Sequence, residues 1–94
     1  MLDLAIRNAE IVTAADRIRA EIGIRDGRIV TIAEDVGAAA EEIDAAGLLA
    51  LPGGIDAHVH LEQPQGGGVV MADGFESGTR SAAAGGNTTV MPFA

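Results

Sequence analysis

The sequence contains no cysteine and no lysine, and Phe75 and Phe93 are its only residues among Phe, Trp and Tyr. Without cysteine the chain forms neither a disulfide nor a thiolate metal site. Six arginines stand against 14 acidic residues, for a net charge of −8. Nucleic acids and anionic membranes need clustered cations, so we predict no nucleic-acid partner and no membrane partner.

Long hydrophobic runs are also missing. No uncharged apolar stretch approaches the roughly 20 residues of a membrane span. The first four residues include Asp3, where a signal peptide would carry positive charge. We therefore expect a cytoplasmic protein.

The chain is short for an independent fold. At 94 residues with 48% apolar composition, it is one small domain or a piece of a larger one. A chain of this length buries only about 60–70% of its unfolded surface, which leaves a freestanding fold marginal. Since the sequence has no disulfide or thiolate metal site to stabilise such a fold, we expect the chain to be a portion of a larger protein.

Residues 1–52 read as a β-rich lobe. Apolar residues alternate with polar ones over residues 2–6 and again over 18–24, the period of half-buried strands. Asp26-Gly27 suits a type I′ hairpin turn leading into a strand over 28–32. Residues 34–42 are acidic and Ala-rich, which fits a short helix or a loop. Two short strands are expected at 43–45 and 48–51.

Residues 53–94 differ in kind, after a break at Pro52. Residues 55–61 read as a strand, 62–72 as a Gly-rich loop, and 88–93 as a second strand. Between them a helix should begin at Asp73 as N-cap and end at Ala84 before two glycines. The fold class expected is mixed α/β, with one strand–helix–strand unit following the β-rich lobe.

The two histidines of the sequence, His58 and His60, lie two residues apart on an expected strand. Side chains at this spacing share a face, so both imidazoles are able to reach one metal ion at about 2.0–2.1 Å. Asp56 lies on the same face and would orient a ligand or hold the strand end. Two surface or core histidines that happen to alternate are the alternative. A catalytic site needs three or four ligands, so the others would lie outside this chain.

Residues 51–64, Leu-Pro-Gly-Gly-Ile-Asp-Ala-His-Val-His-Leu-Glu-Gln-Pro, resemble the first metal-binding strand of the amidohydrolase superfamily. They are most similar to its dihydropyrimidinase/hydantoinase branch of cyclic amidases. Residues 24–29, 42–45, 72–80 and 85–89 resemble other parts of that branch's N-terminal region. The resemblance implies that residues 1–52 are part of a small β-sandwich. It implies that residues 53–94 begin a (β/α)₈ TIM barrel.

The function implied by the resemblance is hydrolysis of a small cyclic amide, with a metal-activated water opening the ring C–N bond. His58 and His60 would bind the more buried metal of a binuclear site, usually zinc, with manganese as an option. The complete enzyme would be a homo-oligomer. No catalytic residue falls in this chain, which we expect to be inactive alone. Gln65 and three glycines follow Pro64 where the branch often has an aromatic residue, so no particular substrate is carried over.

Three other readings stay open. Another amidohydrolase, such as an allantoinase, a dihydroorotase or an exocyclic deaminase, shares the motif, although the Leu61-Glu62-x-Pro64 stretch weighs against deaminases. A non-catalytic dihydropyrimidinase-like protein usually loses metal ligands, whereas both histidines are present here. A self-contained binding module fits poorly with the scarcity of aromatic residues and with the incomplete strand–helix–strand unit.

Overall fold

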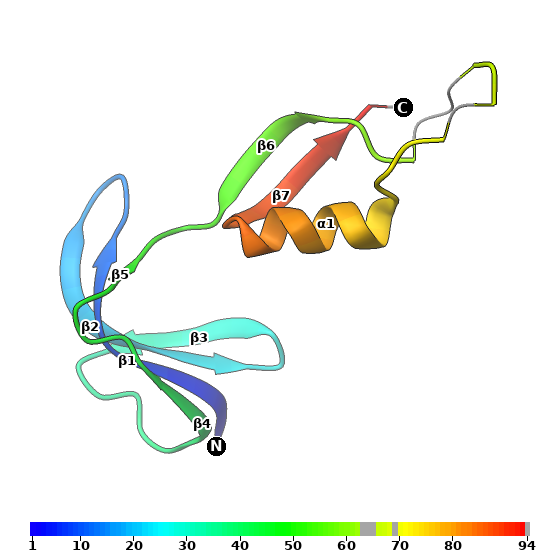
Figure 1. The fold of residues 1–94 in the computed structure, drawn as a ribbon. Helices are drawn as coiled ribbons and strands as arrows, with labels where there is room; N and C mark the ends of the chain where they lie inside the picture. Colours follow the sequence, from blue (N-terminus) through cyan, green and yellow to red (C-terminus); the bar gives the residue numbers. More distant parts are fainter. Residues whose placement is uncertain (63–65, 69, 94) are drawn as a thin grey trace. The chain divides into compact units, whose positions relative to one another are not determined.

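The computed structural model describes residues 1–62, 66–68 and 70–93 (Figure 1). The chain divides into two compact units, Met1–Pro52 and Gly53–Ala94. The first is built of strands, and the second contains the one helix of the described residues. That helix has 10 residues, and no helix in the described ranges is long and apolar enough to cross a membrane.

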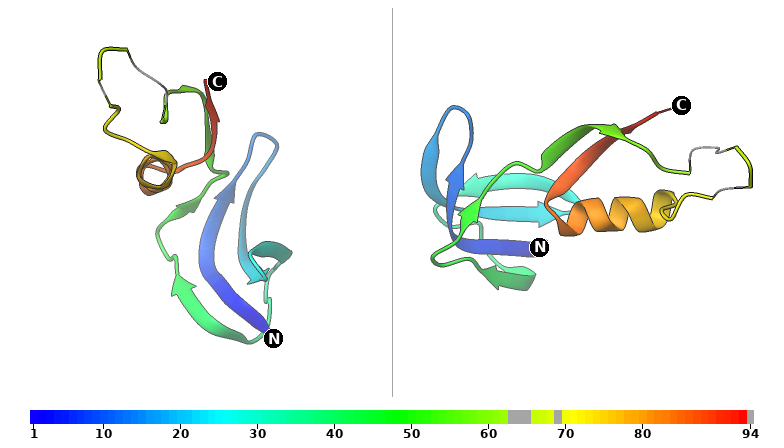
Figure 2. Two further views of the ribbon diagram at one scale, coloured as in Figure 1. Left: turned by 90° about the vertical axis from the view of Figure 1, so that its right-hand side faces the viewer. Right: turned by 45° about the horizontal axis from the view of Figure 1, so that its top comes forward.

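The first unit is a five-stranded mixed sheet (Figures 1 and 2). Its central strand β1 pairs antiparallel with β2, which pairs antiparallel with β3. On its other edge β1 pairs in parallel with both β4 and β5. The strands are β1 (Leu2–Val12), β2 (Arg17–Arg25), β3 (Arg28–Ala33), β4 (Ala39–Asp44) and β5 (Leu49–Ala50).

The hairpin between β2 and β3 is confirmed at Asp26 and Gly27. Both residues have positive φ angles, 52° and 72°, as a type I′ turn requires. The Asp26 backbone N–H also donates to the Asp3 carboxylate at 2.7 Å. This contact ties the turn to the start of β1.

Strand β1 contains a bulge where the sequence pattern is interrupted. Ile6 pairs with Ile22 and Ala9 with Ala20, so Arg7 and Asn8 together face one residue of β2. Asn8 takes a φ of 62°, which asparagine tolerates better than most residues. Because of this extra residue the apolar side chains before and after it stay on one face of the sheet.

Of the two alternatives left open for residues 34–42, the short helix does not form, and the loop extends only to Ala38. Strand β4 begins at Ala39, earlier than the strand predicted at 43–45, and it ends at Asp44. Pairing with β1 supplies hydrogen-bond partners for this backbone and overrides the helix preference of alanine. The strand predicted at 48–51 is shorter, Leu49–Ala50.

The main buried cluster of the first unit lies on one face of its sheet. Its buried members come from β1, β2 and the turn after β4, and partly buried aliphatic side chains pack around them. The buried residues of this cluster are Ala9, Ile11, Ile22 and Ala45, and the surrounding ones are Ile6, Ala20, Ile24 and Ala50. Leu2 and Ala5 are also buried, outside this cluster. The interior of the cluster is thus filled by small and β-branched aliphatic side chains, as expected for a sequence with few aromatic residues.

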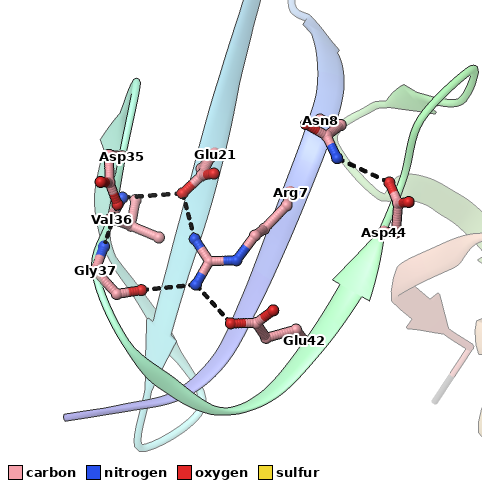
Figure 3. A network of polar contacts seen from close by, with 8 residues as sticks. All are labelled: Arg7, Asn8, Glu21, Asp35, Val36, Gly37, Glu42 and Asp44. Carbon is pink, nitrogen blue, oxygen red and sulfur yellow. Dashed lines mark hydrogen bonds and ion pairs between the residues drawn. The ribbon is translucent and has the colours of Figure 1, made fainter.

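The opposite face carries a polar network centred on Arg7 (Figure 3). Its guanidinium donates to Glu21 at 2.6 Å, to Glu42 at 2.7 Å and to the Gly37 carbonyl at 2.7 Å. The hydrogen bond with Glu42 is the main cause that raises the pKa of Arg7 above its usual value. The same bond lowers the pKa of Glu42. Arg7 therefore links β1 to β2 and β4.

The second unit consists of β6 (Gly54–Val59), α1 (Phe75–Ala84) and β7 (Asn87–Pro92). The two strands pair in parallel, with α1 between them in the sequence, and they run side by side in Figures 1 and 2. The predicted strand–helix–strand order is confirmed. Strand β6 ends at Val59, two residues before the predicted end, so His60 lies just beyond it.

The start of α1 differs from the prediction by one residue. Gly74, not Asp73, is the N-cap, and its backbone N–H donates to the Ser77 hydroxyl at 3.2 Å. The Asp73 carboxylate instead accepts a hydrogen bond from the Ser77 hydroxyl at 3.3 Å. The predicted loop over 62–72 lies partly outside the described residues, and those described in it belong to no helix or strand.

Candidate metal centre

His58 and His60 lie together at the end of β6. Their Nε2 atoms are 3.3 Å apart, and their ring centroids are 5.2 Å apart with planes inclined by 62°. Both side chains are exposed. The structure therefore brings the two predicted ligand residues together with the same nitrogen of each ring turned toward the other.

This separation fits shared coordination of one ion. Two nitrogens bound at 2.0–2.1 Å with a tetrahedral angle between them lie about 3.3–3.4 Å apart. Without a metal, the same distance suits a hydrogen bond from the N–H of one ring to the bare nitrogen of the other. The pair thus suits two positions of a tetrahedral zinc shell with little movement of either ring.

Asp56 contributes to the backbone of this segment. Its Oδ1 atom accepts a hydrogen bond from the backbone N–H of His58 at 3.1 Å. Of the two roles predicted for Asp56, this contact corresponds to holding the strand end. It fixes the main chain from which the His58 ring projects.

Phe93 is a member of the site that the sequence analysis did not identify. Its ring stacks on His60, with centroids 4.8 Å apart and planes within 3°, and meets the His58 ring edge-on at 4.5 Å. Its backbone N–H donates to the Val59 carbonyl at 3.0 Å, which joins it to the end of β6. Parallel pairing of the two strands was the available signal, since it brings their carboxyl ends to one edge of the sheet.

The ligand set within the described part of the chain stops at two. No group of three or more His, Cys, Asp or Glu side chains there is arranged to hold a metal ion. Four-coordinate zinc in a catalytic site takes three protein ligands and a water. The described residues thus supply part of such a shell.

Similarity to known proteins covers nearly the whole chain. The chain is 49% identical to the D-hydantoinase of Geobacillus stearothermophilus over 94% of the chain's own length. It is 44% identical to the allantoinase of Bacillus licheniformis over 95% of that length. These matches span only 19% and 20% of the relatives, so the chain covers about a fifth of their length. No protein-family model matches the chain.

Solved structures agree with the sequence matches. The structure of dihydropyrimidinase from Brevibacillus agri matches with a TM-score of 0.85 and 45% sequence identity. The match covers 99% of this chain and 20% of the dihydropyrimidinase chain. N-acyl-D-glutamate deacylase from Bordetella bronchiseptica, solved with zinc and a phosphonate inhibitor, matches 65% of this chain and 14% of its own. The TM-score there is 0.60, at 42% identity. In sequence and in fold, the chain is similar to about a fifth of the length of proteins named D-hydantoinase, allantoinase and dihydropyrimidinase.

Proposed function

We propose that the complete protein is a metal-dependent hydrolase of cyclic amides, of the hydantoinase type. His58 and His60 are its first two metal ligands. The observation that carries this proposal is the 3.3 Å separation of their Nε2 atoms, which suits two nitrogens bound to one tetrahedral ion. Close similarity to proteins named D-hydantoinase supports the reaction class.

Zinc is the metal we propose, with manganese as the alternative. Imidazole nitrogen is a ligand that zinc binds readily in proteins. The deacylase from Bordetella bronchiseptica, which resembles this chain, was solved with zinc. The remaining ligands and the proton-transfer carboxylate would come from parts of the complete protein outside this chain.

The larger architecture that we propose follows from the same similarity to hydantoinases. Residues 1–52 form part of a small β-sandwich in this proposal, and residues 53–94 form the first strand, helix and second strand of a (β/α)₈ barrel. Parallel pairing of β6 with β7 around a connecting helix is the repeating unit of such barrels. Catalytic groups of these barrels lie at the carboxyl ends of the strands, which is where His60 and Phe93 lie here.

Each residue of the site then has a physical task in the reaction. His58 and His60 hold the ion, which when bound lowers the pKa of a water and polarises the substrate carbonyl. Phe93 restricts the rotation of both imidazole rings by packing against them. Asp56 fixes the His58 backbone. The chain's own residues thus position the metal rather than transfer protons.

The test uses the complete protein and its His58→Ala and His60→Ala variants. Zinc content and hydrolysis of dihydrouracil and 5-substituted hydantoins are measured for each. Both variants should lose bound metal and fall to background rates, while Glu76→Ala, which removes an exposed charge from α1, should keep both. A His60→Ala protein with wild-type zinc content and rate would refute the metal assignment.

Allantoin is the second candidate substrate. Relatives named allantoinase reach 48% identity, nearly the same as those named D-hydantoinase. A substrate panel that includes allantoin and dihydroorotate separates these possibilities. A complete enzyme that opens allantoin at least about tenfold faster than any hydantoin would assign it to the allantoinases.

A further inference from the structure

The segment directly after His60 is fastened to α1. The last pair in the ladder between β6 and β7 is Val59 with Pro92, so His60 lies one residue past the paired strand. Its neighbours Leu61 and Glu62 both contact the first turns of the helix. These contacts fix the main chain on the far side of His60 from the strand.

Leu61 fills a notch in the helix surface. Only 8% of its surface is exposed, and it is the one buried hydrophobic residue in the described part of the second unit. A Cβ atom placed on Gly78 would lie 2.2 Å from Leu61 Cδ2. Leu61 therefore packs where α1 has no side chain, and a larger residue at position 78 would displace it.

Glu62 supplies the cap that α1 otherwise lacks. The N-cap residue is Gly74, which has no side chain to accept hydrogen bonds from the first helical N–H groups. Glu62 Oε2 accepts the Phe75 N–H at 2.6 Å instead. A carboxylate at this end also interacts favourably with the helix dipole.

The backbone of Glu62 is shaped for this task. Its N–H donates to the Asp73 carbonyl at 3.2 Å, and its φ of 49° lies in the left-handed region that glutamate seldom adopts. A Cβ on Gly74 would lie 3.0 Å from Glu62 Oε2, so glycine at the N-cap leaves room for the carboxylate. Two hydrogen bonds and one buried side chain thus oppose the backbone strain at this residue.

We propose that Leu61 and Glu62 form a latch that positions His60 for metal binding by anchoring its main chain to α1. The proposal rests on the metal-binding function proposed for His60. Glu62 is a positioning residue in it, acting through the helix cap. Loss of the cap should loosen residues 60–62 and the first turn of α1 together, and it should speed loss of the metal.

The test compares Glu62→Ala, Glu62→Gln and Glu76→Ala in the complete protein. Gln keeps an oxygen that accepts the Phe75 N–H. Glu76→Ala also removes one carboxylate, from the first turn of the helix that Glu62 caps, and breaks the exposed pair with Arg80 instead of the cap. Hydrogen–deuterium exchange of the metal-free protein is followed in peptides covering 58–62 and 73–78. Transfer of bound zinc to a chelator is timed separately.

Glu62→Ala should speed exchange in both peptides about tenfold, the usual effect of losing a helix cap. It should also speed zinc transfer about tenfold or more, as for the loss of a group that orients a ligand. Glu62→Gln should stay within about threefold of wild type in both measurements, and Glu76→Ala should match wild type. Exchange of β1 and β2 peptides should be unchanged in every variant.

Three results would overturn the latch. Unchanged exchange in Glu62→Ala would show that the cap stabilises neither residues 60–62 nor the first turn of α1. Equal effects of Glu62→Ala and Glu76→Ala would reduce it to a charge effect. Faster exchange with unchanged zinc transfer, where His60→Ala does release zinc, would separate the cap from metal binding. If His60→Ala retains zinc, the function proposed above fails instead, and exchange of the metal-free protein still decides whether the latch exists.

Discussion

The two units of the chain differ in what they bury. Six of the seven buried hydrophobic residues among those described lie in the first unit, and Leu61 is the only one in the second. Both units expose large apolar side chains, and in the second unit these include Ile55 at 70%, Met91 at 56% and Phe75 at 51%. The first unit thus has an interior of its own, whereas the second carries the histidine pair on a layer with little interior.

The first prediction concerns the 94-residue chain without the rest of the complete protein. The 94-residue chain by itself should hydrolyse no cyclic amide above background, because two imidazoles make up half of a tetrahedral shell. Its zinc affinity should be weaker than that of the complete protein by more than about 100-fold, since loss of a single outer-shell partner already costs about 10–100-fold. Zinc calorimetry and release of N-carbamoyl product measure both. Turnover by the short chain would contradict the prediction.

A matched pair of substitutions sharpens the comparison. Ile22 is 7% exposed in the first unit and Ile55 is 70% exposed in the second. Ile22→Ala should lower the free energy of unfolding of the chain by about 2–5 kcal/mol. Ile55→Ala should change it by less than about 0.5 kcal/mol.

The same pair in the complete protein tests the barrel proposal. If β6 is a barrel strand, Ile55 is covered there, and Ile55→Ala should then cost about 2 kcal/mol or more. Urea unfolding of both proteins gives the four values. Equal, small effects of Ile55→Ala in the chain and in the complete protein would argue against the barrel.

Close packing in the first unit predicts a smaller, rescuable effect. A Cβ on Gly23 would lie 2.6 Å from Thr31 Cγ2 and 2.8 Å from Leu2 Cδ1. Gly23→Ala should therefore cost about 1–3 kcal/mol through overpacking. Adding Thr31→Ser removes the nearest methyl group and should recover part of that loss. A double variant no more stable than Gly23→Ala alone would show that Thr31 is not the obstacle.

Acid should weaken the first unit slightly. Hydrogen bonds with Arg7 and Arg17 lower the pKa values of Glu42 and Glu10 below the usual 4.5. The stabilisation is therefore complete above about pH 4.5 and is lost as the pH falls through the lowered pKa values. Since Glu42 is exposed, salt should shrink the effect.

Arg7→Met isolates that contribution. The urea midpoint of the wild-type chain should fall more between about pH 5.5 and pH 3 than that of the variant. The difference should be largest at low salt. Parallel curves for the two proteins would show that the Arg7 pairs add nothing to stability.

How far the sequence predicted this structure depends on how local each signal is. The hairpin at Asp26 and Gly27 follows from two adjacent residues, and the spacing of His58 and His60 determines that they share a face. Parallel pairing of β4 with β1 has no local signal, because its alanines and glutamates favour a helix. The choice of strand is made by partners about 35 residues away in the sequence, such as Arg7 for Glu42.

The candidate metal centre divides in the same way. Its two histidines lie two residues apart in the sequence and were predicted to lie together, whereas Phe93 reaches them through the parallel pairing of β6 with β7. The capping contact of Glu62 spans 13 residues in the sequence. It also depends on a left-handed backbone angle at Glu62, which a glutamate in the sequence does not predict. Hydrophobic periodicity predicts single helices and strands, so it does not predict contacts between residues far apart in the sequence.

The bulge at Asn8 determines where the central strand tolerates a change in length. Deleting one residue from a strand normally turns every later side chain to the wrong face. Asn8 is the extra residue of the bulge, so removing it would leave Ile6 and Ala9 facing as they do now and would regularise the ladder with β2. It would cost the 2.9 Å hydrogen bond from Asn8 to Asp44. Deleting Ala5 instead would turn residues on one side of the gap away from their partners, so relatives that differ by one residue here should differ at the bulge.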